Sequence, residues 1–338
     1  IMSEKKEKKI LSLEDFTKEM KSKFGKNSVI TASEADAYTD VIPFSSESIN
    51  DASGIGGLPI DKVVELIGWE SSGKSTIAND LIGNAQKKFK DCQSLLIDRE
   101  NSFDKFYAET LGVDTANVTL GYPESLEDCY DTVEMALDTK LFKLIIVDSL
   151  TAFRPDATID GNSAMGKESR INSDRMRMVT EKVKDSGCLV IFINQMREKI
   201  GVMFGSPETT SGGNAMKFYA HMRIMMRRSA IDQVAQRNTI SIQFIKNKLA
   251  PPFGKAEVDI IWGKGFDLEQ EAITKAIKAN IIELSGKTYS YNGEKIAVGL
   301  PKLKVFFKEN DHLFQEIREK VKGINVAFDI EETADLEM

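Results

Sequence analysis

Eight residues in the first quarter of the chain constrain its fold more than any other stretch. Gly68-Trp69-Glu70-Ser71-Ser72-Gly73-Lys74-Ser75 fits the pattern GxxxxGK[ST], directly after an apolar run (63–67) and directly before a helical stretch (74–90). In that context the glycines let backbone N–H groups turn inward around phosphate oxygens, and the start of the helix adds a favourable dipole. The segment therefore predicts a P-loop, in which Lys74 reaches the phosphates and the Ser75 hydroxyl binds Mg²⁺.

The sequence around this loop alternates between short runs of β-branched residues and longer stretches with helical periodicity. Strands that are apolar on both faces and joined by helical crossovers predict an α/β fold with a mostly parallel central sheet covered by helices. Three later β-rich runs are expected to extend the same sheet. The expected strands are 63–67, 94–98, 117–120, 144–148, 189–194, 222–226, 239–245 and 257–262, and the expected helices are 74–90, 101–111, 124–139 and 168–186.

The N-terminal and C-terminal segments lack this alternation of strands and helices. Residues 3–26 have the spacing of an amphipathic helix and precede a short β-like piece at 28–31, an arm that either folds back or docks on a neighbour. Beyond 263–265 we expect a helix over 268–284, a hairpin turning at Asn292-Gly293 and a helix near 311–322. The resulting division is an arm (1–37), an ATPase core (38–265), a small C-terminal α/β domain (266–328) and an acidic tail (329–338).

Composition excludes several classes of protein. With 338 residues and 41% hydrophobic content, the chain can bury a substantial core and is not a disordered or collagen-like polymer. Cys92, Cys129 and Cys188 form no CxxC pair and are interpreted as buried thiols in a reducing compartment. No apolar run approaches the roughly 18 residues of a membrane helix. We therefore expect a cytoplasmic protein with no membrane partner.

The net charge of −7 hides a basic segment. Residues 165–228 hold 12 Lys plus Arg against 6 Asp plus Glu, so this segment carries +6. A local positive field suits a polyanionic partner, although an ordinary solvated face has the same composition. Charge alone leaves both interpretations open.

Two carboxylates follow apolar strands, where ligands of α/β sheets bind. Asp148 ends the run 144–148 and is placed to support Mg²⁺. Glu100 comes just after the run 94–98, where a general base for water should stand, although a surface salt bridge would look the same.

The segment 196–214 is unusual because it is long, basic and rich in glycine and threonine. It begins at the end of the predicted strand 189–194. Such a loop is either filler or a mobile binding element. Its composition suits a nucleic acid backbone better than an apolar ligand.

Longer strings make the chain similar to a known family. It resembles the bacterial RecA family of homologous recombinases over nearly its whole length. The strings at 192–220 and 246–253 are more specific to this family than the P-loop, which many ATPases share. The matching strings are 68–76 (GWESSGKST), 97–114 (IDRENSFDKFYAETLGVD), 147–150 (VDSL), 192–220 (FINQMREKIGVMFGSPETTSGGNAMKFYA), 246–253 (KNKLAPPF) and 289–296 (YSYNGEKI).

The resemblance implies an ATP-dependent, helical homo-oligomeric filament on single-stranded DNA that pairs it with homologous double-stranded DNA. It implies that Glu100 activates water, that Gln195 senses the γ-phosphate, and that Lys246 and Lys248 reach the ATP of the neighbouring subunit. The adenine would meet Asp104 and Tyr107. With these two, the residues expected to bind the nucleotide are Gly68, Glu70, Ser71, Ser72, Gly73, Lys74, Ser75 and Thr76, and Ser75 and Asp148 support the metal.

The resemblance also implies two DNA-binding loops, at about 156–177 and 196–214, which bind without regard to sequence. The arm would dock on the adjacent protomer, the C-terminal domain would capture duplex, and the acidic tail would inhibit. The expected DNA contacts are Met165, Arg170, Ser173 and Arg177 in the first loop, Arg197, Ile200, Thr209, Thr210, Ser211, Gly212, Gly213 and Asn214 in the second, and Arg227 and Arg228 beyond it.

Departures from the family pattern leave alternatives open. The first loop is about three residues shorter than usual, and Ser241 and Gln243 stand where basic residues are common. Each lost phosphate contact would flatten the salt dependence of duplex capture by about one unit. One alternative is therefore a filament that coats single strands but exchanges them weakly. Another is a P-loop ATPase or kinase with a non-DNA substrate. The departures indicate a divergent member, for which a phage origin is one hypothesis.

Overall fold

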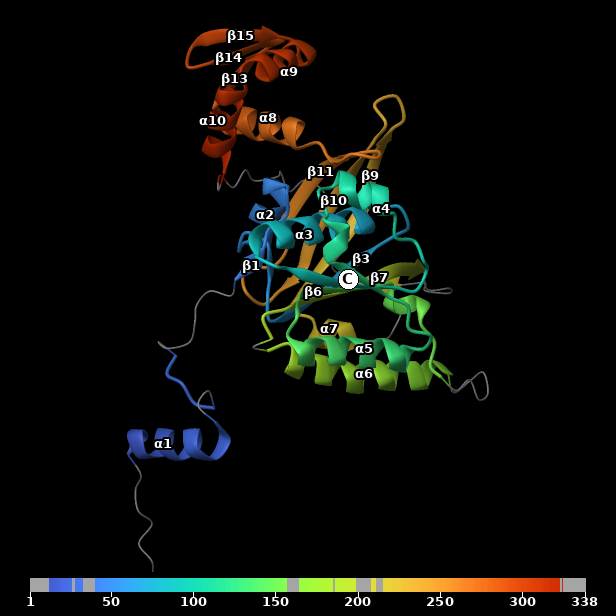
Figure 1. Cartoon of the computed structure of the whole chain (residues 1–338). Helices are drawn as coiled ribbons and strands as arrows, with labels where there is room; N and C mark the ends of the chain where they lie inside the picture. Colours follow the sequence, from blue (N-terminus) through green and yellow to red (C-terminus); the bar gives the residue numbers. More distant parts are fainter. Residues whose placement is uncertain are drawn as a thin grey trace, which may run out of the picture. The chain divides into compact units, whose positions relative to one another are not determined.

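The computed structural model describes residues 12–25, 28–32, 40–156, 164–184, 186–198, 208–210, 215–322 and 324. Its contacts divide the chain into two units, residues 1–40 and 41–338 (Figure 1). Each unit is described below by itself.

The first unit holds the helix α1 (Leu13–Phe24). A capping box starts it, in which the Ser12 hydroxyl accepts the N–H of Asp15 and the Asp15 carboxylate accepts the N–H of Ser12. None of its residues is buried, and Phe16 is 46% exposed. The predicted start of this helix lies outside the described residues. The predicted β-like piece at 28–31 is not a strand, because a strand needs a second strand to pair with.

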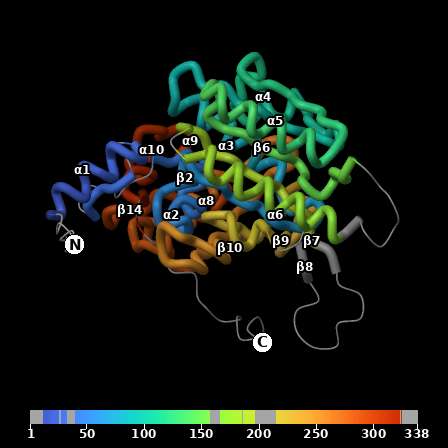
Figure 2. The backbone as a smooth tube through the Cα atoms, turned by 90° about the horizontal axis from the view of Figure 1, so that it is seen from below, coloured from blue at the N-terminus to red at the C-terminus, as the bar shows by residue number. Residues whose placement is uncertain are grey.

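The second unit is built on one ten-stranded sheet. Its order is β12-β11-β10-β9-β3-β7-β6-β4-β5, with β8 paired to β7. The strands from β9 through β5 pair in parallel, whereas β10, β11 and β12 add an antiparallel edge. Figure 2 shows β10 next to β9, where this edge begins. The bounds are β3 (Lys62–Gly68), β4 (Gln93–Asp98), β5 (Val118–Gly121), β6 (Phe142–Asp148), β7 (Leu189–Glu198), β8 (Glu208–Thr210), β9 (Met222–Asp232), β10 (Arg237–Asn247), β11 (Lys255–Ile261) and β12 (Gly265–Phe266). The expected mostly parallel sheet and its later extension are confirmed.

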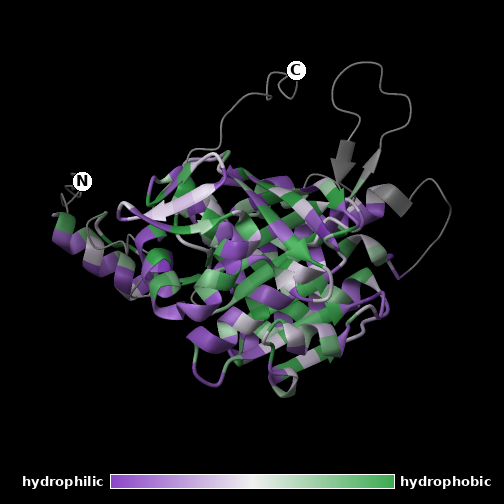
Figure 3. Cartoon of the chain, turned by 90° about the horizontal axis from the view of Figure 1, so that it is seen from above, coloured by the Kyte–Doolittle hydropathy of each residue, from purple (hydrophilic) through white to green (hydrophobic). Residues whose placement is uncertain are grey.

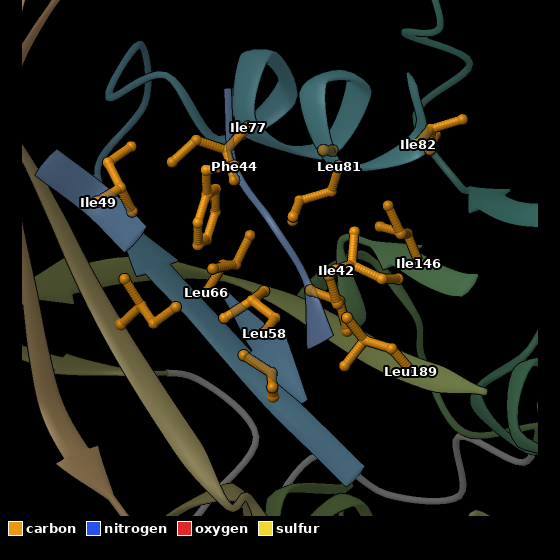
Figure 4. Packing of buried hydrophobic residues seen from close by; sticks show 14 of the residues in the cluster. Ile42, Phe44, Ile49, Leu58, Leu66, Ile77, Leu81, Ile82, Ile146 and Leu189 are labelled. Carbon is orange, nitrogen blue, oxygen red and sulfur yellow. The ribbon is translucent and has the colours of Figure 1, made fainter. Parts of the chain in front are cut away.

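Helices cover both faces of this sheet (Figure 1). Successive strand residues point to opposite faces, so Val64 joins the apolar cluster under α3 and its neighbour Val63 joins the cluster under α5 and α6. Figure 4 shows Ile77 and Leu81 of α3 gathered with Leu66 of β3 in the first cluster. The helices are α2 (Glu47–Ser53), α3 (Lys74–Lys88), α4 (Lys105–Thr110), α5 (Leu126–Thr139), α6 (Ala164–Lys182) and α7 (Ala215–Tyr219), and β1 (Val41–Ile42) and β2 (Leu58–Pro59) form a separate pair.

The C-terminal part has an apolar core of its own, centred on Ile273, Leu303 and Phe307. The expected helix 268–284 is wrong at its end. Asn280, with a φ of 55°, lies past the helix, and Ile282–Ser285 is a strand. The elements are α8 (Leu268–Lys278), β13 (Ile282–Ser285), β14 (Thr288–Tyr291), β15 (Glu294–Val298), α9 (Leu300–Glu309) and α10 (Asp311–Val321).

Helix α8 ties this part to the sheet domain through polar contacts with α2 and the residues before it. Glu271 Oε1 accepts hydrogen bonds from Ser46 Oγ and the Ser48 N–H, both over 2.7 Å. Lys275 Nζ lies 2.5 Å from Asp51 Oδ2. Figure 3 shows green hydrophobic and purple hydrophilic segments alternating along the helices, as expected for helices with one buried face. Within the part of the chain that the structure describes, every helix is too short or too polar to span a bilayer.

Candidate active site

The loop between β3 and α3 has the backbone of a phosphate cradle. Ser71 and Gly73 adopt left-handed φ values of 58° and 86°, and Gly73 is the N-cap residue directly before α3. A Cβ on Gly68 would lie 2.3 Å from Ser72 Oγ and 2.8 Å from the Met226 carbonyl oxygen. Only glycine therefore fits at position 68, where the loop leaves the sheet.

The polar groups of this loop are held ready for an anion. Lys74 Nζ donates to the carbonyl oxygens of Gly68 (3.1 Å) and Trp69 (2.6 Å). Burial lowers the pKa of Lys74, an effect opposed first by Asp148 and then by Glu100. Ser72 Oγ is buried and has no hydrogen-bond partner among the described residues. A nucleotide phosphate fits this arrangement, since it accepts from an ammonium group and a hydroxyl.

Two carboxylates meet where β4 and β6 end. Asp98 and Asp148 are register partners at the ends of these parallel strands. Burial raises the pKa of Asp148 to about 6, with further increases from Asp98 and Glu100 and an opposing effect of Lys74. No three His, Cys, Asp or Glu residues gather into a metal-binding group among the described residues. A site of one carboxylate and the Ser75 hydroxyl still fits Mg²⁺, which takes its remaining ligands from phosphate and water.

Asp98, which sequence reasoning did not single out, holds the turn that presents Glu100. Its carboxylate accepts the backbone N–H groups of Glu100 (3.1 Å), Ser102 (2.7 Å) and Phe103 (2.8 Å). It is 1% exposed. A carboxylate that receives three backbone donors acts as a structural clamp. The sequence signal that could have identified Asp98 was its position as the last residue of an apolar strand, directly before the turn to Glu100.

Glu100 and Gln195 come together although 95 residues separate them. Gln195 Nε2 donates to Glu100 Oε1 over 3.3 Å, and Ser149 Oγ donates to the same oxygen over 3.5 Å. Glu100 itself is exposed. The residues after β4 and β6, together with Gln195 of β7, the register partner of Gly68, thus bring an exposed carboxylate, a hydroxyl and an amide to the same edge as the P-loop.

A cavity of about 270 Å³ adjoins the P-loop. Tyr107 OH lies 2.8 Å from Thr76 Oγ1 in its wall, and Asp104 fixes Tyr107 by accepting its backbone N–H over 3.0 Å at the start of α4. Tyr107 lines this cavity and Asp104 does not, so the expected contact of both residues with the adenine stays a prediction. The lining residues are Ser71, Gly73, Lys74, Ser75, Thr76, Tyr107, Asn238, Ile240, Ile260 and Trp262.

Four of these lining residues, Asn238, Ile240, Ile260 and Trp262, escaped sequence reasoning. They come from β10, from β11 and from the residue after β11, which reach the P-loop through strand pairing. The Asn238 Oδ1 atom is buried and has no partner among the described residues. The one sequence feature that pointed to this group was a tryptophan directly after an apolar strand. In the structure Trp262 is 44% exposed.

Lys246 and Lys248 lie away from the P-loop of their own chain. Lys246 pairs in register with Arg223, three residues along β9 from Met226, which pairs with Gly68. Lys246 Nζ donates to the carbonyl oxygens of Lys217 (2.5 Å) and Phe218 (3.1 Å) in α7. Within one chain these lysines are therefore not part of the nucleotide cavity.

Parts of the two segments expected to be DNA-binding loops form regular secondary structure. Helix α6 begins at Ala164, so Arg170, Ser173 and Arg177 lie on an exposed helical face at spacings of three and four residues. In the second loop, Arg197 pairs with Thr209 and Met196 with Thr210 as β7 and β8. Threonine's β-branch favours this strand. Arg227 and Arg228 are exposed on β9.

Several expected DNA contacts fall outside the described residues. These are Ile200, Ser211, Gly212, Gly213 and Asn214, together with the side chains of Met165, Arg197, Thr209 and Thr210. The acidic tail at 329–338 also lies outside them.

Comparison with known proteins matches two family models to this chain. The RecA N-terminal domain matches residues 11–267, and the RecA C-terminal domain matches residues 270–324. Protein RecA of Delftia acidovorans is 39% identical over 312 residues, which cover 90% of this chain and 84% of the relative. Protein RecA of Sinorhizobium medicae is 38% identical over 327 residues (94% and 90%), and that of Clostridioides difficile is 38% identical over 326 residues (94% and 92%).

Fold, P-loop and sequence identity over most of both chains agree. This chain therefore belongs to the RecA family of recombinases and is a DNA-dependent ATPase.

Proposed function

We propose that the chain assembles as a helical filament on single-stranded DNA and hydrolyses ATP at the boundary between subunits. In this proposal Lys74 binds the phosphates of the substrate. Ser75 and Asp148 hold Mg²⁺, which, when bound, neutralises charge on the phosphate oxygens. Lys246 and Lys248 complete the site from the neighbouring subunit, since they lie apart from the P-loop of their own chain.

Hydrolysis needs a base for water, and Glu100 is the proposed base. Its exposure leaves it accessible to water, and the Asp98 clamp fixes the backbone that carries it. A positioned carboxylate takes the proton of the attacking water as the bond to phosphorus forms. Gln195 keeps Glu100 oriented through the 3.3 Å hydrogen bond.

One observation carries the coupling between ATP and DNA. Gln195, which touches Glu100, lies on β7, and the same strand continues to Glu198 and pairs with β8. We propose that the segment between β7 and β8 binds DNA together with Arg170, Ser173 and Arg177 of α6. A nucleotide that changes the Gln195 contact would then change the strand from which the DNA-binding segment leaves.

A second candidate function is a filament that coats single strands but exchanges them weakly. Ser241 pairs in register with Arg227, and Gln243 pairs with Met225. Both side chains lie on the same face as Arg227, so this surface has fewer cations for an incoming duplex. A strand-exchange assay with homologous duplex separates this candidate from full recombinase activity.

ATP hydrolysis with and without single-stranded DNA, over a series of salt concentrations, tests the proposed function. We expect strong stimulation that weakens as salt rises, because the DNA phosphates release counterions on binding. Turnover that ignores DNA at every salt concentration would contradict the filament proposal.

A further inference from the structure

A row of polar side chains crosses the apolar interior of the sheet. It consists of Asn194 on β7, Glu65 on β3, Arg223 on β9 and Lys246 on β10, and is called the polar row below. Asn194 Nδ2 donates to Glu65 Oε1, and Arg223 Nε donates to Glu65 Oε2, each over 2.5 Å. Arg223 is the register partner of both Glu65 and Lys246. Hydrogen bonds thus connect β7, β3 and β9, and strand pairing places Lys246 of β10 beside Arg223.

Stability does not explain this row. Glu65 and Asn194 are fully buried, and their neighbours Val63, Val64 and Ile193 are apolar residues that would pack as well. Removing two charges from water costs several kcal/mol per ion, and apolar replacements of buried pairs are often as stable. A buried ion pair does fix geometry, because each carboxylate oxygen of Glu65 receives one donor from a different neighbouring strand.

Both ends of the row lead to groups that handle the nucleotide. Asn194 directly precedes Gln195, which donates to Glu100. At the other end, Lys246 donates to the carbonyl oxygens of Lys217 and Phe218 in α7. Helix α7 begins directly after the segment 211–214, where DNA contacts are expected. The row therefore runs from the strand that holds Gln195 to Arg223, the register partner of the lysine expected to reach a neighbour's ATP.

We propose that Glu65 is a positioning residue for ATP turnover. By binding Asn194 and Arg223 at once, it fixes β7 relative to β9, and Arg223 of β9 is the register partner of Lys246, so that Gln195 and Lys246 keep one relative position. This inference rests on the proposed function, since it needs both residues to act on ATP. It predicts that breaking the row lowers turnover within the filament while leaving each subunit able to fold and bind ATP.

The test replaces both charges together, so that neither is left unpaired. Glu65→Gln with Arg223→Met keeps an acceptor for Asn194 and removes the ion pair. The matched control is Asp51→Asn with Lys275→Met, which removes another largely buried ion pair, also 2.5 Å long, between α2 and α8. Both double variants are compared with the parent for melting temperature, binding of a fluorescent ATP analogue, and kcat and KM of DNA-stimulated hydrolysis.

We expect both double variants to melt within a few degrees of the parent. The polar-row variant should lose about tenfold in kcat with KM for ATP changed less than about twofold, because a misplaced group acts on the transition state. The control should keep parental kcat. Parental kcat in the polar-row variant would overturn the inference.

A second variant serves if the double variant does not fold. Arg223→Lys keeps the ion pair but replaces the planar guanidinium, so the charge survives while the geometry of the row is lost. A fall in kcat with normal folding supports the inference, and an unchanged kcat overturns it. A parent chain without DNA stimulation contradicts the proposed function itself, and the inference with it. A stimulated parent with an indifferent polar-row variant contradicts the inference alone.

Discussion

Gln195 Nε2 lies 3.3 Å from Glu100 Oε1, and this contact joins β7 to the turn after β4. An amide that donates to a carboxylate in this way orients the carboxylate without removing its ability to accept a proton, because the second oxygen stays available. This contact places an exposed acid at the edge of the P-loop.

Glu100→Ala should abolish turnover while leaving ATP and DNA binding intact. The loss should be at least about 100-fold, the usual contribution of a positioned general base. Single-turnover hydrolysis and filter binding of DNA measure the two effects. Glu109→Ala, which removes an exposed carboxylate from nearby α4, is the control. Turnover retained in the Glu100 variant would exclude this residue as the base.

Lys246→Ala with Lys248→Ala should lower DNA-stimulated hydrolysis without preventing ATP binding by a single subunit. Neither lysine lines the cavity beside the P-loop of its own chain as described. Binding of a fluorescent ATP analogue at low protein concentration, together with ATPase assays at high concentration, measures the difference. A dilute double variant that binds no ATP would show that the lysines act within their own subunit.

The pH profile should also report on Lys246. Burial, and then the cations Lys248 and Arg223, lower its pKa from 10.5 to about 8, with Glu65 opposing them. The side chain is therefore charged at pH 7 and loses its charge as pH rises through 8. We expect kcat/KM for ATP to fall above about pH 8, since this ratio reports the free protein.

Lys246→Arg should extend the plateau to higher pH, because the guanidinium stays protonated. Lys255→Arg on β11 is the control and should keep the parental profile. A profile that falls at the same pH in the parent and in Lys246→Arg would assign the basic limb to another group.

Much of this site follows from local sequence. The P-loop lies between β3 and α3 as predicted, because the glycines and the lysine that this turn needs are close together in the sequence. The end of α8 was not recognised because Ile281 and Ile282 continue the apolar pattern past Asn280, whose positive φ is the actual stop. Local pattern cannot register a single left-handed residue between two apolar runs.

Residues that reach the site through strand pairing were missed. Asn238 and Trp262 are far from the P-loop in sequence and line its cavity only because β10 and β11 extend the sheet next to β9. The partners of Glu65 were missed for the same reason, since Asn194 and Arg223 are 129 and 158 residues away. A single sequence gives the periodicity of a strand but not its neighbours.

Lys275→Met should destabilise the chain, because it leaves Asp51 without its partner. The two side chains are 7% and 16% exposed, and they lie 2.5 Å apart. Breaking a buried pair by removing one member costs about 3 kcal/mol or more, whereas removing both costs much less. Urea unfolding of the single variant and of Asp51→Asn with Lys275→Met measures this. Equal loss in the single and double variants would show that packing, not charge, is responsible.

Replacing Arg170 and Arg177 with Gln should flatten the salt dependence of single-stranded DNA binding. Both arginines lie on the exposed face of α6 that also carries Ser173. Each lost phosphate contact reduces the slope of log K against log salt by about 0.7 to 1. Fluorescence anisotropy with a labelled oligonucleotide over a salt series gives the slopes.

Arg175 on the same helix provides the matched control for these arginines. Its guanidinium is already paired with Asp131 (2.7 Å) and Glu134 (3.0 Å) of α5, so it is not available to a phosphate. Arg175→Gln should therefore keep the parental slope even if it costs some stability. Parental slopes in the variants of Arg170, Arg177 and Arg175 alike would show that the DNA contacts lie away from this face of α6. A slope that falls only for Arg175→Gln would mean that DNA competes for the α5–α6 ion pairs.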